Sequence, residues 1–239
     1  MADNTRISYS SRAIGKLFDQ FYEKCASTKP VTSYKSESPV GQFGIVAGLS
    51  ATKLDFEGNY DPKVPDANFP MSYNAAGGLF FNLLIPRLKE RVSIYNELAF
   101  TSYKTSESYQ TDYSGNSFIR VTNSLGFGYI KLTNMVRYYI PAGNLKVFLN
   151  AGISNAVTVS ETNEQKTESK FSTPEPVVTK KLVLGSTRSY EFGLAAGLGA
   201  VYKRFGAELR YESSDGISDF SNLKSSVKRY YFLLSYRLK

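Results

Sequence analysis

The side chains that could carry chemistry in this chain are carboxylates, amines and guanidinium groups. Its 239 residues include no His and a single Cys. The absence of His excludes Ser-His-Asp and Cys-His catalysis and any His-ligated zinc site. The lone Cys25 cannot close a disulfide within the chain or build a cysteine zinc site, and we expect it to be a buried small apolar residue. These exclusions favour a non-enzymatic protein, and we predict no catalytic residue, metal site or cofactor; an Asp/Glu or Ser/Lys mechanism stays formally open.

The charged residues alternate with apolar ones instead of forming runs. Glu208, Arg210 and Glu212 stand two residues apart, which stacks opposite charges on one face of a strand. Charged residues on the polar faces of the predicted strands are Arg91, Glu97, Lys131, Arg137, Lys146, Glu191, Glu208, Arg210, Glu212, Arg229 and Arg237. If these faces enclose a lumen, the charges must pair, because an unpaired ion at low dielectric costs several kcal/mol. We predict a structural ion-pair network in which seven cations and four anions leave a net charge of +3.

Strands with a two-residue period must position these charges. From residue 41 onward, apolar and polar residues alternate in eight segments, at 41–52, 71–85, 91–102, 119–140, 145–159, 190–202, 205–213 and 228–238. The alternation slips between Phe127 and Ile130, which predicts a β-bulge near Gly126 or Gly128. Short turns and long polar loops follow each other in turn, the long ones being 53–70, 103–118, 160–189 and 214–227. This asymmetry is typical of outer-membrane barrels.

Glycine and charge indicate which face of the strands lies inside. The polar face is rich in glycine, which weakens a solvated strand but makes room for larger neighbours in a narrow lumen. Its glycines are Gly44, Gly48, Gly78, Gly152, Gly193, Gly197 and Gly199. We therefore predict an all-β, eight-stranded antiparallel up-and-down transmembrane barrel with its apolar face towards lipid. A soluble lipocalin-like barrel, with the polar face in water, is the alternative.

Residues 1–38 have a different organisation. Ile14, Leu17, Phe18 and Phe21 recur at helical spacing, which predicts a short amphipathic helix that Ser10 or Ser11 can cap. We expect residues 1–38 to be a periplasmic helix and linker, and 39–239 to be the barrel. The chain has no 18-residue apolar run, and its first 30 residues show no signal-peptide pattern, so we expect a mature chain or a fragment of a longer protein.

Several segments resemble the PorT-like outer-membrane β-barrel family of Bacteroidetes. The resemblance covers about residues 40–239 and is carried by residues 41–49, 96–100, 129–138, 197–203 and 208–211. It implies a barrel in the Gram-negative outer membrane with both termini in the periplasm. Residues 21–25 are similar to the end of a periplasmic segment in larger relatives. The chain departs from the family at Thr133, where a Pro is usual, at Lys131, where an acidic residue is usual, and at Lys239, where an aromatic is usual.

The favoured function is a membrane anchor or an accessory, interaction subunit of an envelope or secretion complex, with a closed, charge-filled lumen. The long loops or the N-terminal helix would contact protein partners. A small outer-membrane channel or transporter is the first alternative, followed by an outer-membrane enzyme.

The charge of the chain bears on two kinds of possible partner, nucleic acids and the anionic lipids of the outer membrane. The net charge is +8, but no basic run of five occurs, and we expect no nucleic-acid partner. We expect contact with outer-membrane lipid and lipopolysaccharide. The cations of the longest loop, Lys166, Lys170, Lys180, Lys181 and Arg188, could meet lipopolysaccharide phosphates. Glutamates in the same loop favour a mixed, solvated loop instead.

Overall fold

The computed structural model describes residues 10–24, 39–58, 68–88, 91–171 and 175–239. The chain divides into two compact units, Met1–Glu37 and Ser38–Lys239. In the first unit, helix α1 (Ser11–Lys24) begins where the Ser10 hydroxyl accepts a hydrogen bond from the Ala13 amide at 3.2 Å, the geometry of an N-cap. The predicted short helix is confirmed, whereas Cys25 and the linker lie outside the described residues. None of the described helices is long and apolar enough to cross a membrane.

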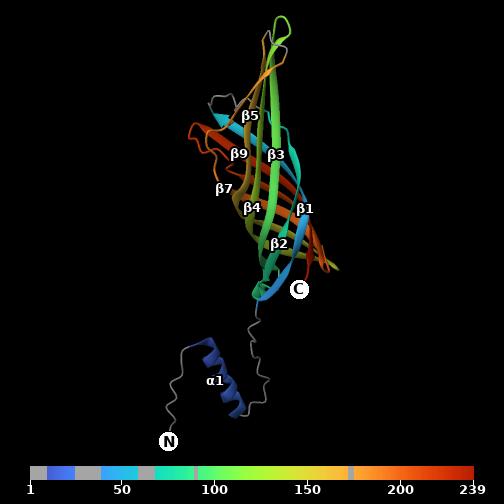
Figure 1. Ribbon diagram of the computed structural model, residues 1–239. Coiled ribbons are helices and arrows are strands. Elements are labelled where there is room, and N and C mark those ends of the chain that lie inside the picture. The colour runs from blue at the N-terminus through green and yellow to red at the C-terminus, as the bar shows by residue number, and fades with distance from the viewer. Residues whose placement is uncertain (1–9, 25–38, 59–67, 89–90, 172–174) are drawn as a thin grey trace. The chain divides into compact units, whose positions relative to one another are not determined.

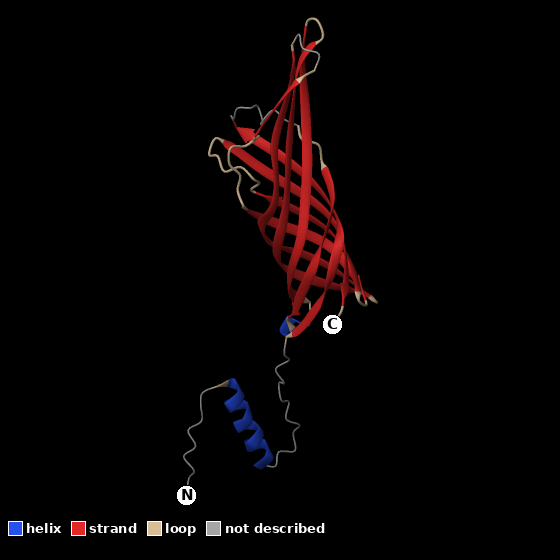
Figure 2. Cartoon of the chain, viewed as in Figure 1, coloured by secondary structure: helices blue, strands red, loops and turns tan. Residues whose placement is uncertain are grey.

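The second unit is a closed ring of eight antiparallel strands (Figure 1, Figure 2). The ring strands are β1 (Val40–Gly58), β2 (Ser72–Leu84), β3 (Val92–Tyr113), β4 (Ser117–Ala142), β5 (Leu145–Lys170), β7 (Tyr190–Tyr202), β8 (Phe205–Ser214) and β9 (Leu223–Arg237). Each ring strand pairs with the next one along the chain, and β9 pairs with β1 to close the ring. The short helix η1 (Pro86–Leu88) follows β2, and a further strand, β6 (Val177–Lys181), pairs with β5 outside the ring. The predicted eight-stranded up-and-down barrel is confirmed.

Some strands are longer than the alternation predicted, at the end of the barrel away from the short turns. Residues 103–113 and 160–170, expected to be loop, continue β3 and β5. The β3–β4 ladder runs to the pair Tyr113–Ser117. We call the four-stranded extension made by 103–113, 117–126, 160–170 and 177–181 the projecting sheet (Figure 1). The alternation of apolar and polar residues does not predict this sheet, because strands can pair through backbone hydrogen bonds without an apolar face where their side chains are in water.

The predicted bulge lies in the expected region but on the neighbouring strand. Gly128 pairs with Ser160 and Tyr129 pairs with Thr158, so Val159 of β5 is the extra residue. In β4 itself, Leu125, Phe127 and Tyr129 are all buried, at the same parity as Lys131. The slip predicted within β4 is therefore wrong. Residues 125–129 of β4 are all buried, and the large side chains that face the lumen at this height are apolar.

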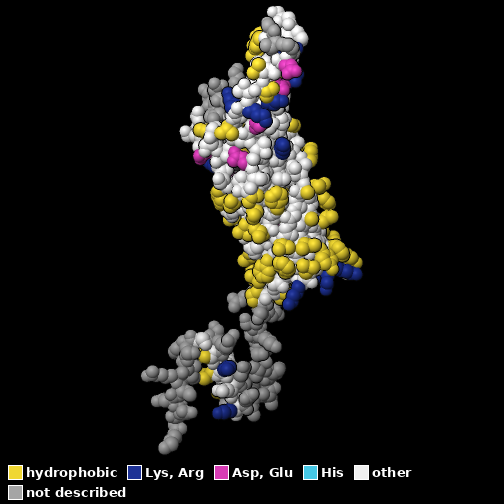
Figure 3. Space-filling view, in the orientation of Figure 1, with side chains coloured by type: hydrophobic (Ala, Val, Ile, Leu, Met, Phe, Trp, Pro, Cys, Tyr) yellow, Lys and Arg dark blue, Asp and Glu magenta, His cyan; other side chains and the backbone are white. Residues whose placement is uncertain are grey.

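The outer face of the ring is apolar and exposed. Along β8 the burial alternates residue by residue, and Leu209 on its outer face is 56% exposed. Leu49 and Leu98 on the outer faces of β1 and β3 are 65% and 52% exposed. In Figure 3 apolar side chains form a belt on the lower part of the barrel, Lys and Arg side chains lie at its lower end, and charged side chains of both signs lie on and around the projecting sheet. An apolar exterior around a polar interior is the arrangement of transmembrane barrels.

Candidate functional site

The middle of the lumen holds buried charges that β8 brings together. Its inward residues Glu208, Arg210 and Glu212 stand two apart, as the pleat requires. Arg210 binds both carboxylate oxygens of Glu97 on β3, with Nη1–Oε1 and Nη2–Oε2 distances of 2.8 Å each. Its Nε also donates to Glu208 Oε1 at 2.6 Å. Each nitrogen of this guanidinium group therefore donates to a carboxylate, and the bidentate contact with Glu97 is stronger than a pair of neutral hydrogen bonds.

Arg137 of β4 extends this chain of charges towards the short turns. Its Nη2 donates to Glu208 Oε2 at 2.8 Å, and its guanidinium carbon lies 3.8 Å from the ring centroids of both Tyr95 and Phe148. The Tyr95 hydroxyl donates to Glu97 Oε2 at 3.0 Å. We call this group the first network; its charged members are Glu97, Arg137, Glu208 and Arg210.

A second network lies nearer the projecting sheet. Glu212 Oε1 accepts hydrogen bonds from Lys131 Nζ and, at 3.0 Å, from Arg229 Nη1. Arg229 also binds both carboxylate oxygens of Glu191, with an Nη2–Oε2 distance of 2.9 Å, and donates to Ser214 Oγ at 3.2 Å. The charged members of the second network are Lys131, Glu191, Glu212 and Arg229.

Each network is buried and electrically neutral, with two cations and two carboxylates. None of the eight residues is more than 7% exposed, and they are all the Asp, Glu, Lys and Arg residues that the described part of the chain buries. The predicted lumen charge of +3 is therefore wrong for the buried section. Pairing to neutrality follows from the desolvation cost of an uncompensated ion.

Three of the predicted network residues lie instead where the barrel meets solvent. Arg91 and Lys146 are exposed, and Arg237 is partly buried, with its Nη2 donating to the Lys203 carbonyl at 3.2 Å. None of the three forms an ion pair with another residue that the structure describes. They stand near the short-turn ends of their strands, where water solvates a cation without a partner.

Two of the predicted inward glycines, Gly44 and Gly199, make room for large side chains, whereas Gly48, Gly78 and Gly152 lie against the backbone of a neighbouring strand. The Phe80 ring comes within 2.6 Å of the place where a Cβ on Gly44 would stand. The Phe148 ring, which stacks on Arg137, likewise occupies the space beside Gly199. In this narrow lumen the large inward side chains occupy the space that a glycine on a neighbouring strand leaves free.

An apolar cluster closes the lumen between the second network and the projecting sheet, and sequence reasoning missed it. It combines inward residues of several strands with residues of the loops before β2, β7 and β9, and we call it the apolar plug. Its members are Leu54, Phe56, Phe69, Tyr103, Leu125, Phe127, Tyr129, Ala156, Val183, Leu184, Ile217, Leu223 and Val227. Phe69, Leu125 and Leu184 have 0% exposure. The signal that could have revealed it is the apolar run of Leu182, Val183 and Leu184 in a segment expected to be a solvated loop.

Asn163 of β5 holds that loop inside the barrel. Its Oδ1 accepts hydrogen bonds from the amides of Val183 and Leu184, both at 3.0 Å, and its Nδ2 donates to the Leu184 carbonyl at 2.7 Å. Part of the segment 160–189, predicted to be a solvated loop, therefore turns inward.

The filled lumen leaves little free space at its centre. A cavity of only about 10 Å³ lies beside Glu97, Lys131 and Arg210, a volume that holds one water molecule at most. A cavity of about 480 Å³ opens at the short-turn end. Within the described residues, no group of His, Cys, Asp or Glu could hold a metal ion.

A closed antiparallel ring, an apolar outer belt and a charged lumen define an integral membrane protein of the β-barrel class. The profile of the outer membrane protein beta-barrel domain family matches residues 40–222, and the chain belongs to that family. It is accordingly a protein of the bacterial outer membrane.

Solved structures similar to this chain are outer-membrane barrels of low sequence identity. OprG from Pseudomonas aeruginosa is 13% identical with a TM-score of 0.44, and the match covers 85% of this chain and 98% of that one. Neisserial surface protein A is 10% identical with a TM-score of 0.39, covering 84% and 99%. Ail of Yersinia pestis is 12% identical with a TM-score of 0.36, covering 83% and 99%. Curated protein sequences gave no match.

Proposed function

We propose that this protein is a non-enzymatic outer-membrane barrel with a closed lumen that acts as a membrane anchor or as an interaction subunit of an envelope or secretion complex. The observation that carries the proposal is the obstruction of the lumen. Two neutral networks and the apolar plug succeed one another along the barrel. Every carboxylate that the described part of the chain buries is engaged by at least one cation, which explains the charges without a catalytic role.

Conductance separates this proposal from its first alternative, a small channel or transporter. Eight-stranded barrels have interiors just wide enough for side chains, and here those side chains include eight paired charges. We expect no steady current when the purified protein is inserted in a planar lipid bilayer. Reproducible open events of constant amplitude would refute the closed lumen and support the channel instead.

The projecting sheet supports the interaction role, because it carries backbone edges and polar side chains beyond the apolar belt. Its outer face holds ion pairs between Arg120 and Glu168 at 3.5 Å, Lys166 and Glu168 at 2.7 Å, and Lys180 and Glu164 at 3.0 Å. The hydrogen bond from Lys166 lowers the pKa of the Glu168 carboxyl group. These carboxylates engage two of the cations proposed for lipopolysaccharide, so the sheet favours a protein partner over lipid phosphates.

We further propose that the short turns and both termini face the periplasm, as in other barrels with short turns at one end. The projecting sheet then faces the exterior, and the PorT-like Bacteroidetes resemblance supports this orientation. Residues 1–38 would form a periplasmic helix and linker attached to the barrel at 39–239. The outer belt would contact the acyl chains of outer-membrane lipid.

Purification of the tagged chain from native membranes in mild detergent tests the interaction role. We expect a stoichiometric partner that is lost when residues 108–122 are deleted, a cut that rejoins Glu107 to its ladder partner Asn123. Removal of residues 1–37 is the matched control, and it would trace the partner to the helical unit if that variant alone loses it. Recovery of no stoichiometric partner with the full chain would refute the interaction role and leave the anchor.

A further inference from the structure

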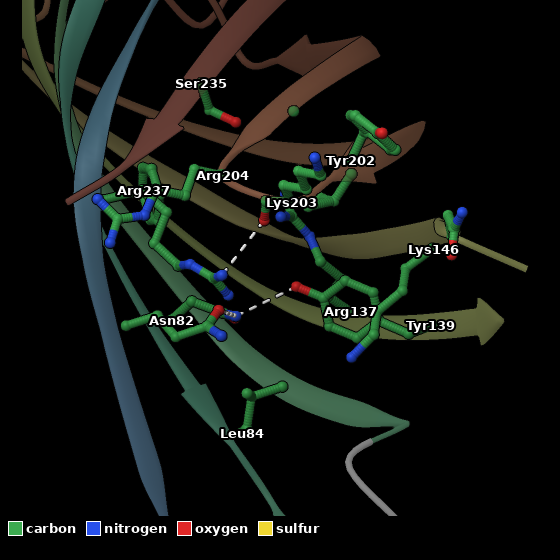
Figure 4. A pocket seen from close by; sticks show the side chains of 15 residues that line it. Asn82, Leu84, Arg137, Tyr139, Lys146, Tyr202, Lys203, Arg204, Ser235 and Arg237 are labelled. Atoms are coloured by element: carbon green, nitrogen blue, oxygen red, sulfur yellow. Dashed lines mark hydrogen bonds between the residues drawn. The ribbon is translucent and has the colours of Figure 1, made fainter. Parts of the chain in front are cut away.

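The cavity of about 480 Å³ at the short-turn end of the barrel has the features of a ligand site (Figure 4). It lies beyond the first network, whose Arg137 contributes to its lining. Its volume falls within the range of small-molecule pockets in proteins. The anchor function uses none of this space, so the cavity needs a separate account.

The lining of this cavity is strongly cationic. Arg137, Lys146, Lys203, Arg204 and Arg237 all line it, and no Asp or Glu is found among the described lining residues. Lys203 and Arg204 form the tight turn between β7 and β8, where Lys203 takes a φ of 54°. Only Arg137 of the five is paired with a described carboxylate, at Glu208. The buried networks are neutral, so this end of the lumen carries a local excess of about four positive charges, which attracts anions.

Two buried polar atoms in the lining lack a partner. Arg137 is 5% exposed and its Nε donates to nothing, while Asn82 is 2% exposed and its Oδ1 accepts nothing. The amide nitrogen of Asn82 is already committed, to Gln42 Oε1 at 3.0 Å and to the Tyr139 hydroxyl at 3.1 Å. Figure 4 shows Asn82 joined to Tyr139 and, above this pair, Arg237 joined to Lys203. The free oxygen of Asn82 can only accept, so it fits a ligand group that donates a hydrogen bond, such as a hydroxyl.

We propose that this cavity binds a phosphate ester that also carries hydroxyl groups. Several guanidinium and ammonium groups fit a multiply charged anion better than a single carboxylate, and guanidinium matches phosphate oxygens bidentately. Arg204 and Arg237 would hold the phosphate and Asn82 would accept from a hydroxyl. Lys146, Lys203 and Arg204 are exposed at the mouth, which leaves the cavity open to solvent. A free glycerol phosphate and the headgroup of phosphatidylglycerol share this chemistry.

Calorimetric titration of the full chain in uncharged maltoside micelles tests the site with glycerol 3-phosphate as the soluble probe. Nanodiscs of phosphatidylcholine, with or without phosphatidylglycerol, test the headgroup by the amount of lipid retained on the protein. We expect saturable binding at one site in one of the two arms, weakened at least tenfold in the double variant R204Q/R237Q. The matched control R120Q/R188Q removes two arginines from the far end of the barrel and should bind as the unchanged protein does.

The arms and variants make the proposal refutable. Binding of glycerol 3-phosphate assigns the site to a soluble ester, and retention of phosphatidylglycerol alone assigns it to a lipid. Asn82→Ala should abolish the preference for glycerol 3-phosphate over inorganic phosphate, or for phosphatidylglycerol over phosphatidic acid. Absence of binding in both arms, or equal weakening by the two double variants, would overturn the proposal. Gel mobility of the unheated variants shows that each barrel is folded.

Discussion

Replacement of Arg210 by Met should destabilise the barrel more than any single change to its surface charges. Arg210 is 4% exposed, donates twice to Glu97 at 2.8 Å and once to Glu208 at 2.6 Å. Without it, Glu208 keeps Arg137, but Glu97 keeps only the Tyr95 hydroxyl. A buried ion pair that loses one partner costs about 3–5 kcal/mol, because the other charge stays desolvated and uncompensated. We expect a loss of about that size in the free energy of unfolding.

A double-mutant cycle separates the lost charge from the lost packing. Glu97→Gln removes the carboxylate that Arg210→Met leaves unpaired. The double variant should therefore lose about 1–3 kcal/mol less free energy of unfolding than the two single variants lose together. Urea titration of barrels folded in phosphatidylcholine vesicles measures this. The chain has no Trp, so unfolding is followed by circular dichroism and gel mobility. The control is Arg120→Met, whose partner Glu168 lies at 3.5 Å on an exposed face. If Arg210→Met costs no more than this control, or if the cycle shows no coupling, the network does not stabilise the barrel as argued.

Three further changes test other layers of the molecule. Leu98 lies on the outer belt and is 52% exposed, so Leu98→Lys should lower the free energy of unfolding in vesicles by about 2–4 kcal/mol. The control Ser106→Lys, further along the same strand, should leave it unchanged. Equal effects of the two variants in urea titrations would place the belt outside the bilayer. Leu184→Ala in the apolar plug should cost about 2–5 kcal/mol, whereas Leu182→Ala, at a position 58% exposed, should cost little, and a reversal of that order by circular dichroism would contradict the inward path of the loop. Asn163→Ala removes three hydrogen bonds to Val183 and Leu184, so limited proteolysis should cleave the loop before β7 faster, and unchanged cleavage would show that the plug holds the loop without Asn163.

The alternation of apolar and polar residues was enough to predict the eight-stranded ring and the inward position of the charges. A two-residue period assigns each residue to a face, and glycines on the polar face indicate a crowded interior rather than solvent. Eight of the eleven predicted network residues, among them Glu97, Arg210 and Arg229, do meet in the lumen. Arg91, Lys146 and Arg237 share their parity but stand at the ends of their strands. The alternation along a strand shows which face a residue lies on, but it says little about how far along the barrel axis the residue stands.

The sequence by itself determined the class of fold, because local alternation along each strand decides which side chains face lipid and which face the lumen. Only the tertiary structure decided which charges pair, since Arg210 and Glu97 are 113 residues apart and meet across the closed ring. Ring closure also decided that the buried charge sums to zero and that Val183 and Leu184 fold inward to close the lumen. The cationic cavity follows from the same cause: cations from separate turns and strand ends converge there only when the strands are staggered around one barrel.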